Sequence, residues 1–212
     1  MHQVFGAYMK GLDDYTMDER GDVGSWIRMA SIRGLCMIIE LLFDIGSNFE
    51  AFGSLDVWLP PSTYHEALGG ILKQGVERLD NVRRQAGESF LKLLRKEPPT
   101  VQESEKWRIH GRPLMEQLFL KYVTCYATLT FVMTFLFRSE ADVGWNEGQW
   151  LFPKAVRMLE VEMYRLPILR GLTFSVGSRT DSTVSLPNSI DTDILINTIC
   201  SNVPLLCVLE HT

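Results

Sequence analysis

The sequence lacks the residue patterns that mark disulfide-bonded and zinc-binding domains. Its 212 residues include four cysteines, none of them in a C-x-x-C pair, and four histidines, none at zinc-ligand spacing from a cysteine. The cysteines are therefore expected to be reduced thiols that mostly fill the core. The histidines are interpreted as solvated or hydrogen-bonded side chains rather than catalytic bases: His2, His65, His110 and His211.

Catalytic and nucleotide-binding motifs are also missing. The sequence has no G-x-x-x-x-G-K-[ST], no G-x-G-x-x-G, no H-E-x-x-H and no G-x-S-x-G. These absences predict a protein that is not an enzyme, has no catalytic residue and binds no cofactor or metal.

Positive charge is not in excess. Lysine and arginine number 21 against 26 aspartates and glutamates, for a net charge of −5, which argues against binding to a nucleic-acid backbone. Basic residues gather between residues 78 and 96, interleaved with acids. This mixture is typical of a solvated, ion-paired helix face, and a docking surface for an acidic protein is the alternative.

The uncharged segment at residues 122–137 is too short to span a membrane as a helix. Residues 122–137 carry no charge, but a helix of that length would be roughly 24 Å, against a hydrocarbon core of roughly 30 Å. Four threonines interrupt the segment. We expect a buried helix or strand pair and no membrane contact, and a small helical protein anchored in a membrane by residues 122–137 is the alternative.

What the sequence does contain is apolar residues at helical spacing, so the predicted fold class is all-α. The expected helices cover residues 2–12, 22–45, 63–79, 81–96, 113–120, 150–164 and 167–176.

Two of these helices share a pattern that suggests repeats. In Val82-Arg83-x-x-Ala86 the valine would pack inward, the arginine would reach an acid in the adjoining turn, and the alanine would allow close helix contact. Ile27-Arg28 occupies the same place 55 residues earlier, and Asp22 and Asp80 are the candidate acids. The pattern matches the inner helix of HEAT repeats and predicts a HEAT/armadillo-like solenoid, with an irregular helical bundle as the alternative.

Inward-facing residues are predicted from the same spacing. In the helix opening at Asp22, Gly34 is expected to allow a close helix contact, and the expected buried stripe comprises Val23, Trp26, Ile27, Ala30, Met37, Ile38, Leu41, Leu42 and Ile45. The stripe expected in the last helix pair comprises Val156, Leu159, Met163, Leu169, Leu172 and Val176.

The most unusual local feature is an acidic block between the first two helices, residues 12–28. It is either a capped turn whose acids pair with arginines or an acidic recognition loop. Four residues are expected to shape the turn: Gly21, Asp22, Gly24 and Arg28. The candidates for partner contact are Asp13, Asp14, Tyr15, Asp18, Glu19 and Arg20.

This block resembles the C-terminal domain of the tubulin-folding cofactor D family, whose pattern is L-D-D-Y-T-[TV]-D-x-R-G-D-V-G-x-W-[VI]-R-x-A. The sequence follows it from Leu12 to Ala30 and departs at Met17, where threonine or valine is usual. Residues 71–94 and 145–183 resemble the same family, the latter with Phe152-Pro153 and a run from Tyr164 to Leu172. We therefore expect one helical domain over residues 1–183.

Two regions do not follow the family. Residues 121–138 form an atypical insertion, and residues 184–212 form an atypical tail that is expected to be disordered or mis-annotated. Both are poor in charge and rich in Ile, Val, Thr and Cys. Our hypothesis is that both are translated non-coding sequence, which sequencing of the spliced transcript would test.

The resemblance implies a function. Cofactor D is a large HEAT-type chaperone that binds β-tubulin after its release from the chaperonin. With the other tubulin-folding cofactors and an Arf-like small GTPase, it assembles the αβ-tubulin dimer and stimulates GTP hydrolysis at tubulin's own site. The resemblance further implies a cytoplasmic, cytoskeleton-associated protein. A generic solenoid scaffold with other partners is the alternative.

Overall fold

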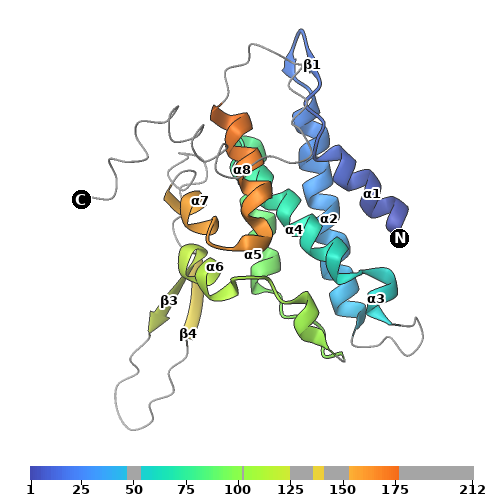
Figure 1. Ribbon diagram of the computed structural model, residues 1–212, viewed down its shortest axis with the longest axis vertical. Coiled ribbons are helices and arrows are strands. Elements are labelled where there is room, and N and C mark those ends of the chain that lie inside the picture. Colours follow the sequence, from blue (N-terminus) through green and yellow to red (C-terminus); the bar gives the residue numbers. More distant parts are fainter. Residues whose placement is uncertain (47–53, 102, 125–135, 141–152, 177–212) are drawn as a thin grey trace.

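The structure is a computed structural model of the 212-residue chain, and it describes residues 1–46, 54–101, 103–124, 136–140 and 153–176. Helices predominate in these residues, which confirms the all-α prediction (Figure 1). The helices are α1 (His2–Gly11), α2 (Gly24–Gly46), α3 (Leu55–Trp58), α4 (Pro61–Gly75), α5 (Asp80–Arg95), α6 (Arg112–Phe119), α7 (Pro153–Met158) and α8 (Glu162–Val176). The strands are β1 (Met17–Asp18), β2 (Gly21–Asp22), β3 (Leu120–Thr124) and β4 (Leu136–Glu140).

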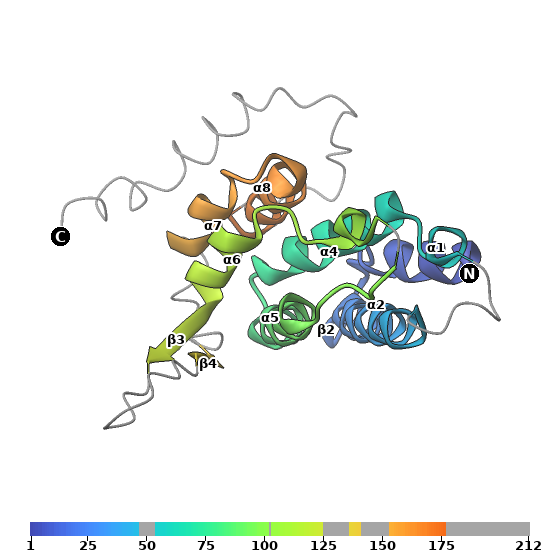
Figure 2. The same ribbon diagram turned by 90° about the horizontal axis from the view of Figure 1, so that it is seen from below.

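The helices stack as repeated pairs. Figure 2 shows α2 and α5 side by side in one layer, with α1 and α4 in the layer above them. Helix α8 packs on the other side of α4. Each layer therefore takes one helix from each pair, which is the arrangement of a helical-repeat solenoid.

The repeat pattern of α5 has the predicted contacts. Val82 and Ala86 are buried, and Arg83 forms an ion pair with Asp80, the first residue of the same helix. In α2 the equivalent Arg28 pairs with Asp22, as expected. The equivalence stops at Ile27, which is about half exposed although Val82 is buried.

The predicted buried stripe of α2 is wrong. Trp26, Ile27, Met37 and Leu41 are exposed, and of that stripe only Leu42 is fully buried. The residues that α2 does bury lie on the opposite side: Arg28, Ile32, Leu35, Ile39 and Phe43. Because α2 is apolar on both sides, spacing could not show which side would meet α1 and α5.

Gly34 makes the close contact that was expected of it. A Cβ atom at this position would lie 2.4 Å from the ring of Tyr8, so its absence lets α1 pack directly on α2.

The last helix pair divides at a different place from the one predicted. The break lies between Met158 and Glu162, and Pro167 stands inside α8 rather than at its start. Proline costs α8 one backbone hydrogen bond, but its ring packs against Gly69 of α4, where an added Cβ would lie 3.0 Å away. Val156 and Met163, predicted to face inward, are exposed because a stripe cannot continue across the break.

The segment before α6 contains a buried anchor. Trp107 lies in a short 3-10 helix (Ser104–Trp107), and its side chain is buried. Its indole Nε1 donates a hydrogen bond to the Leu59 carbonyl at 2.9 Å. The segment is thereby held against the end of α3.

The ends of the uncharged segment pair with each other. Strands β3 and β4 are antiparallel, with Tyr122 opposite Arg138 and Thr124 opposite Leu136. One helix through residues 122–137 would separate these ends, so the pairing fits the predicted strand pair. Residues 125–135, like 177–212, lie outside the described residues. In the described part of the chain, no helix has the length and apolarity to cross a membrane.

Candidate partner-binding site

The acidic block forms a small hairpin between α1 and α2. Met17 pairs with Asp22 and Asp18 with Gly21, so Glu19 and Arg20 stand at the tip. Gly21 adopts φ +110°, a conformation that side-chain-bearing residues rarely take. Asp18 accepts hydrogen bonds from the backbone N–H of Arg20 at 2.7 Å and from its guanidinium at 2.7 Å. The tip is therefore internally paired and points into solvent.

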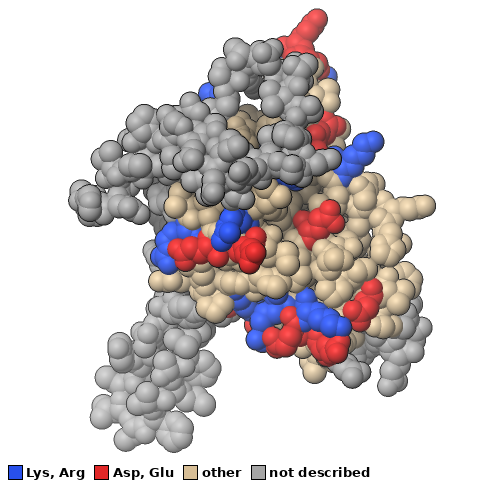
Figure 3. Space-filling view, in the orientation of Figure 1, with Lys and Arg blue, Asp and Glu red and all other residues tan. Residues whose placement is uncertain are grey.

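Three of the predicted partner residues are exposed at this tip: Asp18, Glu19 and Arg20. Acidic side chains project from the end of the molecule where β1 lies (compare Figures 1 and 3). The tip can reach another protein without any movement of the helices.

The base of the hairpin is organised around Arg28, whose side chain is 0% exposed. Its Nη2 donates to Asp22 Oδ2 at 2.9 Å, and its Nη1 donates to the Asp14 carbonyl at 2.6 Å. The Glu77 carboxylate, in the turn that follows α4, lies 3.8 Å from the same Nη2 atom. Arg28 therefore joins the hairpin to the next repeat.

Asp22 and Gly24 complete this base. The Asp22 carboxylate accepts a hydrogen bond from the Ser25 backbone N–H at 3.0 Å, which satisfies a free donor at the start of α2. A Cβ at Gly24 would lie 2.4 Å from the Asp14 carbonyl oxygen. Asp22, Gly24 and Arg28 thus have contacts within the hairpin base, and Gly21 contributes its positive φ to the turn.

Tyr15 is placed inside the domain. Its ring stacks on Phe174 of α8 with centroids 4.9 Å apart, and the Arg28 guanidinium lies 4.3 Å from the ring centroid. Its hydroxyl oxygen accepts a hydrogen bond from Gln74 Nε2 at 3.3 Å. Burial raises the pKa of Tyr15 to about 12. These contacts connect the hairpin to α4 and α8.

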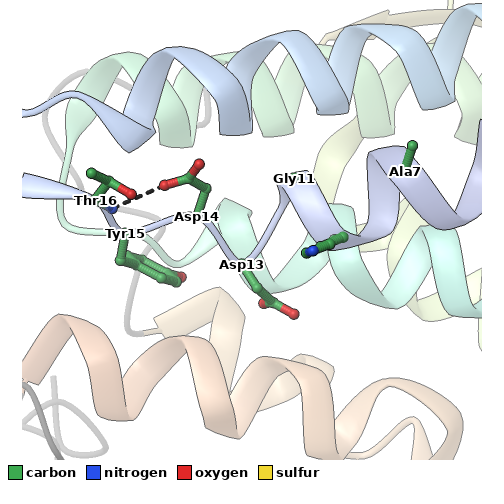
Figure 4. Close-up of a pocket in the computed structure, with 7 residues that line it drawn as sticks. Ala7, Gly11, Asp13, Asp14, Tyr15 and Thr16 are labelled. Atoms are coloured by element: carbon green, nitrogen blue, oxygen red, sulfur yellow. Dashed lines mark hydrogen bonds between the residues drawn. The ribbon is translucent and has the colours of Figure 1, made fainter.

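Asp13 and Asp14 border a shallow hollow of about 690 Å³ beside the end of α1 (Figure 4). Asp14 turns back to Thr16, whose side chain and backbone N–H hold the pKa of that carboxyl below its ordinary value. Asp13 extends toward α8 and forms an ion pair with Lys73 of α4. Both carboxylates thus have partners within the chain.

The structure adds residues that the sequence did not indicate: Lys73, Gln74, Glu77 and Phe174. Gln74 is fully buried and its amide donates to the Leu12 carbonyl at 2.8 Å. These four lie about 50 to 160 residues after the hairpin residues that they contact, and no local spacing links them to the hairpin.

The chain matches one family model. Residues 65–187 match the family described as tubulin folding cofactor D C terminal, and no solved structure matches. The match includes residues 71–94 and 145–183, which resemble the family by their sequence, and it begins after the acidic block. Because the match covers more than half of the chain, this protein belongs to the tubulin folding cofactor D C-terminal family.

Proposed function

We propose that this domain is a non-enzymatic tubulin chaperone module that binds β-tubulin during folding after the chaperonin and during assembly of the αβ dimer. The observation that carries the proposal is the family match over residues 65–187, which supports a role as a tubulin folding cofactor. A stacked-helix framework suits this role because repeat proteins bind partners over extended surfaces.

The proposed setting is a cofactor assembly in the cytoplasm, associated with the cytoskeleton. Its other members are the remaining tubulin-folding cofactors and an Arf-like small GTPase. The domain contributes to GTPase activation by holding tubulin in the assembly, and tubulin supplies the groups that hydrolyse GTP.

The hairpin tip is the part of the acidic block best placed to contact tubulin. Asp18, Glu19 and Arg20 are exposed, whereas Tyr15 is packed between α2 and α8. Asp13 and Asp14 are engaged with Lys73 and Thr16. Asp13 keeps its carboxylate 68% exposed in its ion pair, so it is also open to a partner. We therefore divide the six candidates into four that can contact the partner and two, Asp14 and Tyr15, that position the hairpin.

A pull-down of purified tubulin by the tagged chain tests the proposal, with a known cofactor D protein as the positive control. We expect the chain to retain tubulin. Asp18→Ala/Glu19→Ala is expected to weaken retention about threefold to tenfold, as for charges at an interface rim. Glu66→Ala/Glu88→Ala removes two exposed carboxylates from α4 and α5 and is the matched control.

Retention by the positive control and none by this chain would count against tubulin binding. If the hairpin variant and the control variant lose tubulin retention equally, the hairpin is not part of the interface. The proposal of tubulin binding would then stand without the hairpin contact.

A further inference from the structure

The last turn of α8 lies against the base of the acidic hairpin, although about 160 residues separate the two along the chain. The Phe174 ring stacks on the Tyr15 ring with centroids 4.9 Å apart and an angle of 11° between the ring planes. Figure 4 shows Tyr15 and Asp13 on the side of the hairpin that faces α8. Stacked aromatic pairs stabilise beyond the area that they bury, so this contact holds the hairpin against α8.

The end of α8 is itself held in place by α4. A Cβ atom at Gly171 would lie 2.4 Å from the Lys73 carbonyl oxygen, so the glycine lets the two helices touch there. One turn later, the Ser175 hydroxyl donates a hydrogen bond to the Val76 carbonyl at the end of α4. Phe174 lies between these two contacts along α8, so α4 fixes the place at which its side chain leaves the helix.

Lys73 of α4 takes part in the same contact. Its ammonium group lies 5.4 Å from the Tyr15 ring centroid and 5.2 Å from the Phe174 ring centroid, within cation–π range of both rings. It also forms an ion pair with Asp13, and its own side chain is only 12% exposed. We call these four residues the α8 latch: Asp13, Tyr15, Lys73 and Phe174.

The latch is less buried than the base of the hairpin. At the base, Arg28 is 0% exposed, and its contacts join the hairpin to α2 and to Glu77. In the latch, Phe174 is 45% exposed and the Asp13 side chain is 68% exposed. A substitution at Phe174 therefore removes a contact of the hairpin and leaves the packing of the core in place.

The base and the latch hold the hairpin at different residues. The base holds Asp14 and Asp22 through Arg28, whereas the latch holds Asp13 and Tyr15. Two separate attachments fix the direction of a short hairpin, and a single attachment lets it pivot. The exposed tip therefore takes its direction from both.

We propose that Phe174 and Lys73 are positioning residues for the hairpin tip that contacts tubulin. They act through Tyr15 and Asp13, which they hold against α4 and α8. A hairpin already held in its binding direction loses less conformational entropy on association, so the latch raises affinity. By linkage, tubulin bound at the tip stabilises the latch in return. The inference rests on the proposed function, because it assigns tubulin to the tip.

The first test measures the hairpin of the full chain by amide hydrogen exchange, without tubulin. Phe174→Ala removes the ring stack, and we expect the amides of residues 16–24 to exchange about threefold to tenfold faster, while those of α5 keep the parent rate. Phe174→Tyr retains the ring and should keep the parent rate. Leu166→Ala shortens another exposed side chain of α8 and is the matched control. Unchanged exchange in Phe174→Ala would overturn the proposal.

The second test asks whether Phe174 acts through the tip, by equilibrium binding to purified αβ-tubulin. Phe174→Ala should weaken binding about threefold to tenfold in the parent chain, and Phe174→Tyr should not. In the Asp18→Ala/Glu19→Ala background, Phe174→Ala should change binding by less than about twofold, because the tip contact is already lost. Equal losses in the two backgrounds would make Phe174 a direct tubulin contact and overturn its role as a positioning residue.

The same two measurements test Lys73. Lys73→Gln removes the charge, so we expect faster exchange in the hairpin and weaker tubulin binding, each by about twofold to fivefold. Lys73→Arg keeps the charge and should stay closer to the parent chain in both measurements. If Lys73→Gln matches the parent chain in both, Lys73 is not a positioning residue.

The outcomes separate this proposal from the proposed function. If the parent chain binds tubulin and Phe174→Ala leaves both hairpin exchange and binding unchanged, the latch proposal is wrong and the proposed function stands. If the parent chain does not bind tubulin while a known cofactor D protein does, the proposed function fails, and the role of the latch in tubulin binding fails with it.

Discussion

The two turns that join paired helices in this domain use the same ion pair in different ways. In the turn between α1 and α2, Arg28 is 0% exposed and Asp22 only 12%. In the turn between α4 and α5, Arg83 is buried but Asp80 is 64% exposed. Arg28 also contacts Asp14, Tyr15 and Glu77, whereas Arg83 bonds the Glu77 and Arg78 carbonyls of its own turn.

This difference shows that one repeat signature can serve two purposes. The contacts of Arg83 stay within the short segment that joins α4 to α5. The Arg28 turn carries a hairpin that extends into solvent, and its arginine joins that hairpin to the neighbouring repeat through Glu77. The first turn should therefore matter more to the stability of the whole domain, and the following predictions test that ranking.

The largest expected effect is that of Arg28→Ala. It leaves the mostly buried Asp22 and Glu77 carboxylates without their cation, so the free energy of unfolding should fall by about 3–5 kcal/mol. Arg83→Ala leaves carbonyl groups unpaired and should cost about 1–3 kcal/mol. Urea denaturation followed by circular dichroism measures both. Equal losses would contradict the ranking of the two turns.

A smaller loss is expected from Gly24→Ala. The added Cβ would meet the Asp14 carbonyl oxygen at 2.4 Å, so the hairpin base must shift, at a cost of about 1–3 kcal/mol in unfolding free energy. Gly6→Ala in α1 is the control, because a Cβ there meets nothing within 4 Å and should stabilise by about 0.4–1 kcal/mol. If Gly24→Ala is as stable as the control, the close contact at the hairpin base is not required.

On acidification, the packing around α4 should lose stability at a higher pH than the hairpin does. His65 of α4 lies 3.0 Å from both the Tyr164 hydroxyl and the Lys106 carbonyl, and burial holds its pKa below the ordinary value of 6.5. The unfolded chain therefore binds a proton at His65 more readily than the folded chain does. The contribution of His65 to stability is fully present above pH 6.5 and declines as the pH falls below 6.5. Asp14, whose pKa lies below its ordinary 3.8, contributes to such a decline only at more acidic pH.

Melting temperatures measured between pH 7.5 and 3 check this order. The decline should be shallower in His65→Gln, since that variant has no group at position 65 that takes up a proton. A decline of the same steepness in His65→Gln would assign it to other groups.

The smallest effect on stability is expected at the hairpin tip. Asp18 and Arg20 pair in solvent, and exposed ion pairs contribute little, so Asp18→Ala/Glu19→Ala should change unfolding free energy by less than about 0.5 kcal/mol. A larger loss, measured by the same denaturation experiment, would place the tip with the structural base of the hairpin rather than with the partner-contacting residues.

Much of the repeat framework could be predicted from the sequence. The repeat pattern of α5 placed Val82 and Ala86 against the core, where both are buried. The arginine–acid pairs of both turns could also be predicted, because each pair lies within six residues along the chain. Local spacing is sufficient when the interacting groups belong to one turn.

Features set by distant neighbours could not be predicted in this way. The buried side of α2 depends on where α1 and α5 pack, because both of its sides are apolar. The place of Pro167 inside α8 depends on its contact with Gly69, almost one hundred residues earlier. The partners of Tyr15 and Asp13 likewise come from α8 and α4.

The sequence by itself determined that this chain forms helices of the cofactor D C-terminal family, with an acidic turn in which Asp22 pairs with Arg28. Helical periodicity, turn glycines and local ion pairs depend on residues that are close along the chain. They can therefore be predicted from the sequence. Only the tertiary structure decided which acidic residues stay at the surface and which side of α2 remains uncovered. Burial is the reason, because it depends on which segments pack together after distant parts of the chain have met.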